Sequence, residues 1–138
     1  MKLLLDTNVL IDVLAKRAGF YRDSLETLRF CEAGGVSAFV SAVSVADVMY
    51  IMRKYLPREA LRNAVKTLLA ITSVADVTRG DINNAFSSAM SDYEDAVQAY
   101  CAKRIRADFI ITRNTRDFAG SPVKAVTPSE FLKMVSRP

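Results

Sequence analysis

Histidine and tryptophan are absent from this 138-residue sequence. Without histidine, the chain lacks the usual general base at neutral pH, which excludes Ser-His and Cys-His nucleophilic sites. The only cysteines, Cys31 and Cys101, lie far apart in apolar helical patterns, which indicates buried thiols rather than a disulfide framework. They also cannot complete a zinc site without histidine ligands. Any catalysis must therefore rest on other groups.

Long hydrophobic runs are also lacking. The apolar amino terminus is interrupted by Asp6, Asn8 and Asp12, well short of the ~18 apolar residues that suggest a membrane span. We therefore expect a cytoplasmic protein with no membrane partner. With 51% hydrophobic residues, no repeat and no glycine-rich or serine-rich linker, the chain is expected to form one domain over residues 1–138. A net charge of +4 and a pI near 9.2 are compatible with nucleic acid, although charge alone is a weak indication.

Short apolar runs alternate with longer helical patterns along the chain, which predicts a parallel sheet covered by helices. The predicted strands span residues 2–5, 36–41, 71–75, 109–112 and 124–126. The predicted helices span residues 7–16, 21–33, 44–55, 58–69, 78–88, 92–106 and 129–135.

Asp6 directly follows the first predicted strand, where two roles are open. Ligands bind at the carboxyl ends of strands in an open parallel sheet, so Asp6 is a candidate site residue. Asp6 or Thr7 could equally cap the helix that follows. Asp12 lies off the apolar face of that helix, with Lys16 four residues further on. We therefore expect Asp12 to be a surface charge paired along the helix.

Asp47 lies in the first turn of a predicted helix that follows the second strand. Ser44 and Asp47 have the spacing of a capping box, in which the acid serves only the helix end. However, aspartate is a poorer partner for this motif than glutamate or glutamine, and Asp47 would lie above the end of the strand. Both interpretations remain open.

The predicted helix over residues 92–106 begins with several acids that helical geometry separates. Ser91 and Glu94 have the spacing of a capping box, which explains Glu94 without a function. Asp92 and Asp95 share a face that continues through small residues. Because a carboxylate on a packing face loses solvation unless a cation or hydrogen bonds meet it, Asp95 is the strongest site candidate among the acids.

Asn114 and Asp117 follow the fourth predicted strand, where they are also common turn formers. However, Asp6 and Asp47 follow strand ends too, so a parallel sheet gathers all four at one edge, within reach of Asp95. Carboxylates gathered there repel one another unless a cation is bound. Oxygen ligands without histidine or cysteine favour Mg²⁺ or Mn²⁺.

A carboxylate-bound divalent ion is suited to phosphodiester hydrolysis. Such an ion makes a bound water acidic enough to attack, and it neutralises charge on the phosphoryl and leaving oxygens. This chemistry needs no histidine base, in agreement with the composition. The residues themselves thus indicate a metal-dependent phosphodiesterase site on a parallel sheet.

The sequence resembles the PIN domain family of metal-dependent ribonucleases, which includes the toxins of VapBC toxin-antitoxin pairs. The resemblance spans nearly the whole chain and rests on "LLDTNVLID", "VSAVSVADVMYIMRK", "DYEDAVQAYCAKRIRADFIITRNTRDF" and "VTPSEFL". It implies an α/β fold, a PIN-like three-layer sandwich with a mostly parallel sheet of about five strands flanked by helices. It also implies RNA as substrate, a possible antitoxin protein as partner and frequent homodimerisation.

The resemblance also assigns roles to individual residues. The implied catalytic acids are Asp6, Asp47, Asp95 and Asp117. The implied ligands for Mg²⁺ or Mn²⁺ are Asp6, Asp92, Asp95, Asn114 and Asp117. The implied substrate-binding residues are Asn8, Thr112, Arg113 and Arg116. Lys16 and Arg17 lie near the site in sequence and could also hold phosphates, although solvated surface charge is the commoner role of a single basic residue.

Two functional hypotheses follow. The first is a divalent-metal-dependent endoribonuclease, a candidate toxin of a toxin-antitoxin pair. The second is a catalytically weakened PIN-like module that binds RNA or protein. It is motivated by Asp47, which is shorter than the glutamate usual in the family, and by Asn114, which is neutral where some relatives carry aspartate. A phosphatase with Asp6 as nucleophile is less favoured, because Asn8 replaces the second aspartate that such enzymes place two residues on.

Overall fold

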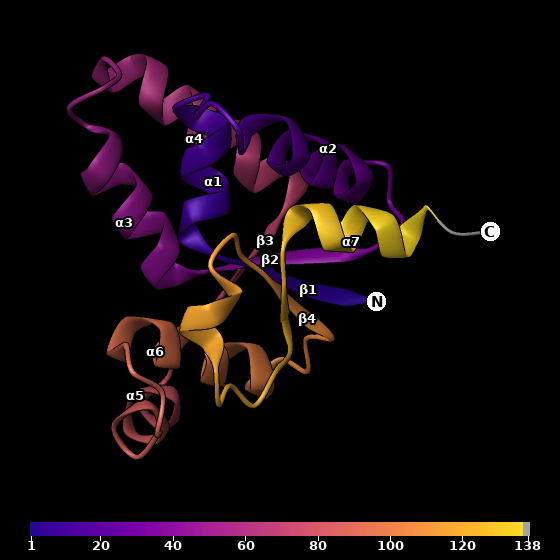
Figure 1. The fold of residues 1–138 in the computed structure, drawn as a ribbon. Coiled ribbons are helices and arrows are strands. Elements are labelled where there is room, and N and C mark those ends of the chain that lie inside the picture. Colours follow the sequence, from indigo (N-terminus) through magenta and orange to yellow (C-terminus); the bar gives the residue numbers. More distant parts are fainter. Residues whose placement is uncertain (137–138) are drawn as a thin grey trace.

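The structure is a computed structural model that describes residues 1–136. At its centre is a five-stranded parallel sheet with the strand order β3-β2-β1-β4-β5 (Figure 1). The strands are β1 (Lys2–Leu5), β2 (Ser37–Ser41), β3 (Ser73–Ala75), β4 (Phe109–Ile111) and β5 (Ala125–Val126). The helices are α1 (Thr7–Leu14), α2 (Tyr21–Glu32), α3 (Ala42–Met52), α4 (Arg58–Ile71), α5 (Arg79–Phe86), α6 (Tyr93–Arg104), α7 (Pro128–Val135) and the short 3-10 helix η1 (Thr115–Phe118). The predicted α/β class and the number of strands are confirmed.

Helices cover both faces of the sheet, so the protein has three layers (Figure 1). On one face, Leu3 and Leu5 pack into a core that includes Phe131 of α7. On the other face, Leu4 packs with Ala99 of α6. All three leucines of β1 are fully buried. A central parallel strand has no solvent-facing side, which explains the unbroken apolar run at the start of the sequence.

The strand register brings three chain segments together at one edge of the sheet. Leu5 of β1 pairs with Ile111 of β4, so the next residues of the two strands, Asp6 and Thr112, are neighbours. On the other side of β1, Leu4 pairs with Phe39, so the end of β2 lies beside Asp6. The fold thus places Asp6 between the ends of β2 and β4, as expected for a site at the carboxyl ends of parallel strands.

Two predicted helix starts are wrong in their capping residues. α3 begins directly after β2 and is capped by Ser41, whose Oγ accepts a hydrogen bond from the Ser44 backbone N–H at 3.0 Å. α6 is capped by Asp92, which accepts from the Asp95 N–H at 2.9 Å. Ser44 and Ser91 are therefore not the caps; Ser41 and Asp92 have the extended backbone of an N-cap residue.

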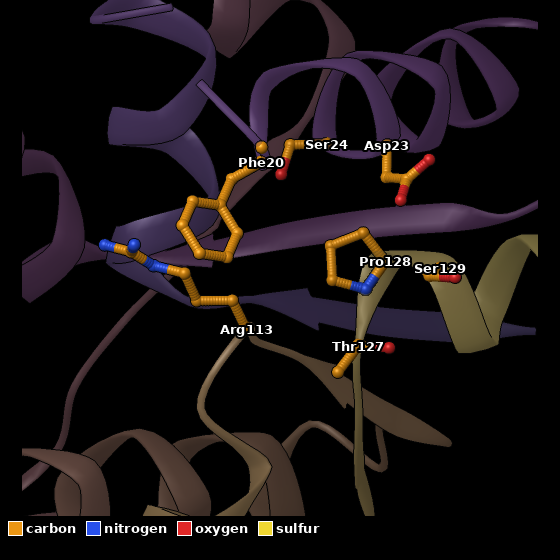
Figure 2. A pocket seen from close by; sticks show the side chains of 8 residues that line it. Phe20, Asp23, Ser24, Arg113, Thr127, Pro128 and Ser129 are labelled. Atoms are coloured by element: carbon orange, nitrogen blue, oxygen red, sulfur yellow. The ribbon is translucent and has the colours of Figure 1, made fainter. Parts of the chain in front are cut away.

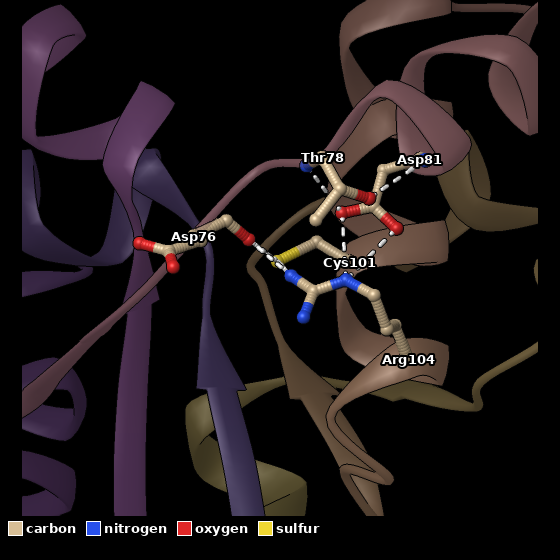
Figure 3. Close-up of polar contacts among 5 residues, drawn as sticks. All are labelled: Asp76, Thr78, Asp81, Cys101 and Arg104. Carbon is tan, nitrogen blue, oxygen red and sulfur yellow. Dashed lines mark hydrogen bonds and ion pairs between the residues drawn. The ribbon is translucent and has the colours of Figure 1, made fainter.

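Arg104 of α6 contacts Asp81 of α5 and the segment before it (Figure 3). Its Nε lies 3.1 Å from Oδ2 and 3.2 Å from Oδ1 of Asp81, and its guanidinium also donates to the backbone carbonyl of Asp76. Asp81 is buried and completes the capping box of α5 with Thr78. This group of contacts secures α6, whose first turn carries acidic residues of the predicted site.

Cys31 and Cys101 are buried free thiols, as predicted. Within residues 1–136, none of the helices combines the length and the hydropathy that crossing a bilayer requires.

Candidate acidic site

Asp6 lies at the centre of the site and is only 6% exposed. Its Oδ1 accepts hydrogen bonds from the Thr7 N–H at 2.9 Å and from Gln98 Nε2 at 3.3 Å. Its Oδ2 accepts from the Thr112 hydroxyl at 2.9 Å. Burial raises the pKa of Asp6, the three hydrogen bonds oppose this rise, and the charge of Asp117 adds to it. Asp6 therefore caps α1 and also lines a cavity, so the cap does not exclude the predicted site role.

Thr112 supports Asp6 and does not face solvent. Its side chain is fully buried, and its hydroxyl also accepts hydrogen bonds from Asn8 Nδ2 at 3.3 Å and from the Asn114 N–H at 3.2 Å. We expected Thr112 to bind substrate, but its hydrogen-bonding capacity is used inside the protein. Thr112 thus positions Asp6, and its expected substrate role stays a prediction.

Replacing Thr112 by valine should lower the free energy of unfolding by about 1–3 kcal/mol at pH 7, because the buried Asp6 carboxylate loses a donor. Urea denaturation measures this change. Thr67→Val is the matched control, since the exposed Thr67 hydroxyl donates only to the Asn63 carbonyl on α4. Equal losses in the two variants would contradict the role assigned to Thr112.

Gln98 is a site residue that the sequence did not reveal. It is 2% exposed on α6, and its Nε2 donates to Ser44 Oγ at 2.7 Å as well as to Asp6. Ser44 Oγ in turn lies 2.7 Å from the Thr7 hydroxyl. Gln98 Oε1 has no hydrogen-bond partner within the described chain. The only signal in the sequence was one amide within the otherwise apolar "AVQAYCA", and a buried amide is expected to be hydrogen-bonded.

A cavity of about 310 Å³ opens beside Asp6. Its lining includes three predicted site residues besides Asp6, namely Asn8, Asp92 and Asp95. Burial raises the pKa of Asp95 to about 7, and the charges of Asp6, Asp92 and Asp117 contribute to the rise. These four carboxylates are therefore near enough to repel one another, as their positions after strand ends and at one helix start predicted.

Asp47 and Glu94 form a separate carboxyl pair. A hydrogen bond with Asp47, followed by burial and by the charges of Asp47, Asp92 and Asp95, raises the pKa of Glu94 to about 7. Glu94 lines the cavity, whereas Asp47 is not among the lining residues. Glu94 was predicted to be only a helix cap, and it is instead the acid through which Asp47 is linked to the site.

The segment after β4 carries three further predicted site residues, Asn114, Arg116 and Asp117. All three are exposed, and none of them lines the cavity. Asp117 nevertheless acts on the site, because its charge raises the pKa values of Asp6 and Asp95. Ligand and substrate roles for the three residues stay predictions.

Asp12 is fully buried, so its predicted place at the surface is wrong. Its Oδ2 lies 3.5 Å from Nε of Arg113, and its Oδ1 lies 3.8 Å from Arg17. The Arg113 guanidinium also stacks 4.5 Å from the centre of the Phe20 ring (Figure 2). Because α1 is covered on this side by a segment more than 100 residues away in sequence, a helical face alone could not place Asp12.

Arg113 was expected to bind RNA phosphate, and the structure gives it other partners. Besides Asp12 and Phe20, it lines a second cavity of about 220 Å³, together with Asp23, Thr127 and Pro128 (Figure 2). Only 22% of its side chain is exposed. Arg113 is therefore engaged within the protein and lines a cavity other than the one that contains Asp6.

The donor chemistry of the site fits a divalent cation. Its candidate ligands are oxygen atoms, which Mg²⁺ and Mn²⁺ prefer. Burial, followed by the charges of Asp6, Asp92 and Asp117, raises the pKa of Asp95, and a bound cation would compensate for this. Among residues 1–136, however, no three Asp, Glu or Cys side chains already form a complete ligand set.

The chain belongs to the PIN domain family, whose model matches residues 2–116. One relative is Ribonuclease VapC1 of Aquifex aeolicus (strain VF5), which is 22% identical over 137 residues, covering 96% of this chain and 94% of the relative. The structure is also similar to a toxin-antitoxin complex from Klebsiella pneumoniae, with 26% identity, a TM-score of 0.70, and 91% and 97% of the two chains covered. VapBC2 from Rickettsia felis, bound to a DNA fragment from its promoter, has 18% identity, a TM-score of 0.71, and coverage of 92% and 98%.

Proposed function

We propose that this protein is a divalent-metal-dependent endoribonuclease and the toxin of a toxin-antitoxin pair. The observation that carries the proposal is the pair Asp6 and Asp95. Asp6 is buried where the central strand ends, and its charge helps to raise the pKa of Asp95 across the same cavity. Membership of the PIN domain family and the likeness to a VapC ribonuclease support RNA as the substrate.

In this proposal, Asp6, Asp92, Asp95 and Asp117 hold Mg²⁺ or Mn²⁺. The bound ion would supply a water acidic enough to attack a phosphodiester and would neutralise the charge that develops on the phosphate oxygens. The chain's own contribution is to orient Asp6 and to oppose the rise that burial causes in its pKa. Hydrogen bonds from Thr112, Gln98 and the Thr7 N–H favour the charged carboxylate and fix its rotamer.

The relatives described as VapBC and toxin-antitoxin complexes support an antitoxin protein as partner. We include this partner, and homodimerisation, in the proposed function. Co-expression with a short open reading frame next to this one, followed by co-purification, is the direct test of the antitoxin.

The nuclease proposal is tested with purified protein and a mixed-sequence RNA in Mn²⁺, in Mg²⁺ and in chelator. We expect cleavage in the presence of metal and loss of cleavage in chelator, together with Mn²⁺ binding measured by calorimetry. Cleavage that persists in chelator would contradict the metal requirement. A protein that neither binds Mn²⁺ nor cuts RNA would contradict the nuclease assignment itself.

A specific observation favours the second candidate function, a PIN-like binding module with weakened catalysis. The Asp47 carboxyl helps to raise the pKa of Glu94 and does not line the cavity, so it is not positioned as a direct metal ligand. A pure binding module would hold RNA equally well in metal and in chelator. A gel-shift measurement under both conditions separates the two candidates.

A further inference from the structure

The acidic cavity has one basic residue in its lining. Four carboxylates, Asp6, Asp92, Glu94 and Asp95, line it together with Arg17. A nuclease must bring a polyanion next to these carboxylates. A positive charge at this position would attract the phosphates that the carboxylates repel. The way Arg17 is held decides whether its donors are open to a phosphate.

The local backbone turns Arg17 back onto α1. The helix ends at Leu14, and Lys16 takes a left-handed conformation with φ of 50°. The Arg17 N–H then donates to the Asp12 carbonyl at 3.1 Å. This turn places the Arg17 guanidinium 3.8 Å from the buried Asp12 carboxylate, on the side of α1 that borders the cavity.

Asp12 attracts Arg17, but the N–H donors of Arg17 do not bind Asp12. The 3.8 Å separation is an ion pair without a hydrogen bond, and both Asp12 oxygens lack hydrogen-bond partners within the described residues. Over the same part of the chain, the Arg17 guanidinium makes no hydrogen bond. Its side chain is 40% exposed. A guanidinium has five N–H donors in a fork that matches a phosphate group, and here the fork is oriented but unoccupied.

We propose that Arg17 binds a phosphate of the RNA at the mouth of the acidic cavity and that Asp12 is its positioning residue. This inference rests on the proposed nuclease function. It differs from the expectation for Arg113, the other arginine near Asp12, which stacks on Phe20 beside a different cavity. An acidic group of a protein partner is the competing occupant, and the experiment distinguishes it from RNA.

The test compares Arg17→Gln with Arg62→Gln, a matched loss of an exposed arginine on α4. Affinity for a labelled mixed-sequence single-stranded RNA is measured from low to high KCl, in an Asp95→Asn background that prevents cleavage. Arg17→Gln should weaken binding at low salt and reduce the slope of log K against log salt by about 0.7, the value for one lost phosphate contact on a single strand. Arg62→Gln should leave the slope unchanged.

Further measurements belong to the same experiment. In the active protein, Arg17→Gln should raise KM more than it lowers kcat, and Mn²⁺ affinity measured by calorimetry should not fall. Arg17→Lys should restore the salt slope, because it keeps the charge. Asp12→Asn should also keep the slope, since Arg17 remains, while it weakens RNA binding about two- to fivefold through loss of orientation.

The proposal is overturned if Arg17→Gln and Arg62→Gln give the same slope while thermal unfolding shows both variants folded. It is also overturned if Arg17→Gln weakens binding of the antitoxin but not of RNA. These results differ from failure of the proposed function, in which the wild-type protein itself does not cut RNA with metal. Normal cleavage by wild type, together with an unaffected Arg17→Gln variant, removes only the role of Arg17.

Discussion

Asp95→Asn should abolish RNA cleavage and at the same time make the metal-free protein more stable. Loss of a residue that only supports a metal ligand typically lowers activity or metal affinity 10- to 100-fold. Asp95 faces the cavity directly, so we expect kcat/KM to fall at least about 100-fold and Mn²⁺ affinity to fall with it. Asparagine keeps the shape of the side chain, so the measurement reports the lost charge.

The stability effect of this substitution depends on pH. The pKa of Asp95 is about 7 in the folded protein, whereas an unfolded aspartate has a pKa of about 4. Between these values the folded state binds more protons than the unfolded state, so stability falls as pH rises. Asp95→Asn removes this loss. After allowance for solvent screening, we expect a gain of roughly 2 kcal/mol at pH 8 and little change at pH 4.

Asp76→Asn is the matched control for both effects. Asp76 directly follows β3 at the same edge of the sheet, but it is exposed and does not line the cavity. It should leave cleavage intact and shift stability by less than about 0.5 kcal/mol. If Asp95→Asn loses activity but is also less stable at pH 8, the lost activity would be attributable to misfolding and the metal role of Asp95 would lose its support.

Much of the fold follows from local pattern. Short apolar runs recur between helical segments, and β1 is apolar from Leu3 to Leu5, where it is covered on both faces. Parallel pairing then gathers the residues after each strand at one edge, so the sequence predicted that Asp6 lies at this edge, within reach of Asp95. These predictions depend only on the direction of the strands and on helical periodicity.

The remaining features depend on contacts between segments distant in sequence. Gln98 reaches Asp6 across 92 residues, and its partner Ser44 is 54 residues away. Asp12 is buried by residues that follow β4, about 100 positions later. No periodicity within one helix contains this information. Acids on helices rich in apolar residues can therefore differ in burial. Asp95 on α6 is half-buried, whereas Asp12 on α1 is fully buried.

The second large effect concerns the Asp12–Arg113 ion pair. Removing Arg113 should lower the free energy of unfolding much more than removing the charge of Asp12. Arg113→Ala leaves the fully buried Asp12 carboxylate with Arg17 at 3.8 Å as its remaining cation. An uncompensated buried charge costs several kcal/mol, so we expect a loss of roughly 2–4 kcal/mol in the free energy of unfolding at pH 7. Urea denaturation at pH 7 and pH 4 measures it. The loss should be smaller at pH 4, where a carboxylate of raised pKa can take up a proton.

Asp12→Asn should change the same free energy by less than about 1 kcal/mol. Burial raises the pKa of Asp12, which means that folding disfavours its charge, and its oxygens have no hydrogen bonds to lose within the described chain. Arg113 and Arg17, left behind, are 22% and 40% exposed and remain partly hydrated.

Two more variants separate charge from packing in this pair. Arg113→Met keeps an apolar stem against Phe20 and should destabilise nearly as much as Arg113→Ala if charge dominates. Adding Asp12→Asn to Arg113→Ala should recover at least half of the lost stability, because the buried charge is gone. If Asp12→Asn alone costs as much as Arg113→Ala, the ion pair stabilises the fold. If it costs little, then Asp12 is dispensable for folding, and its burial between two arginines at the carboxyl edge of the sheet is explained by the orientation of those arginines.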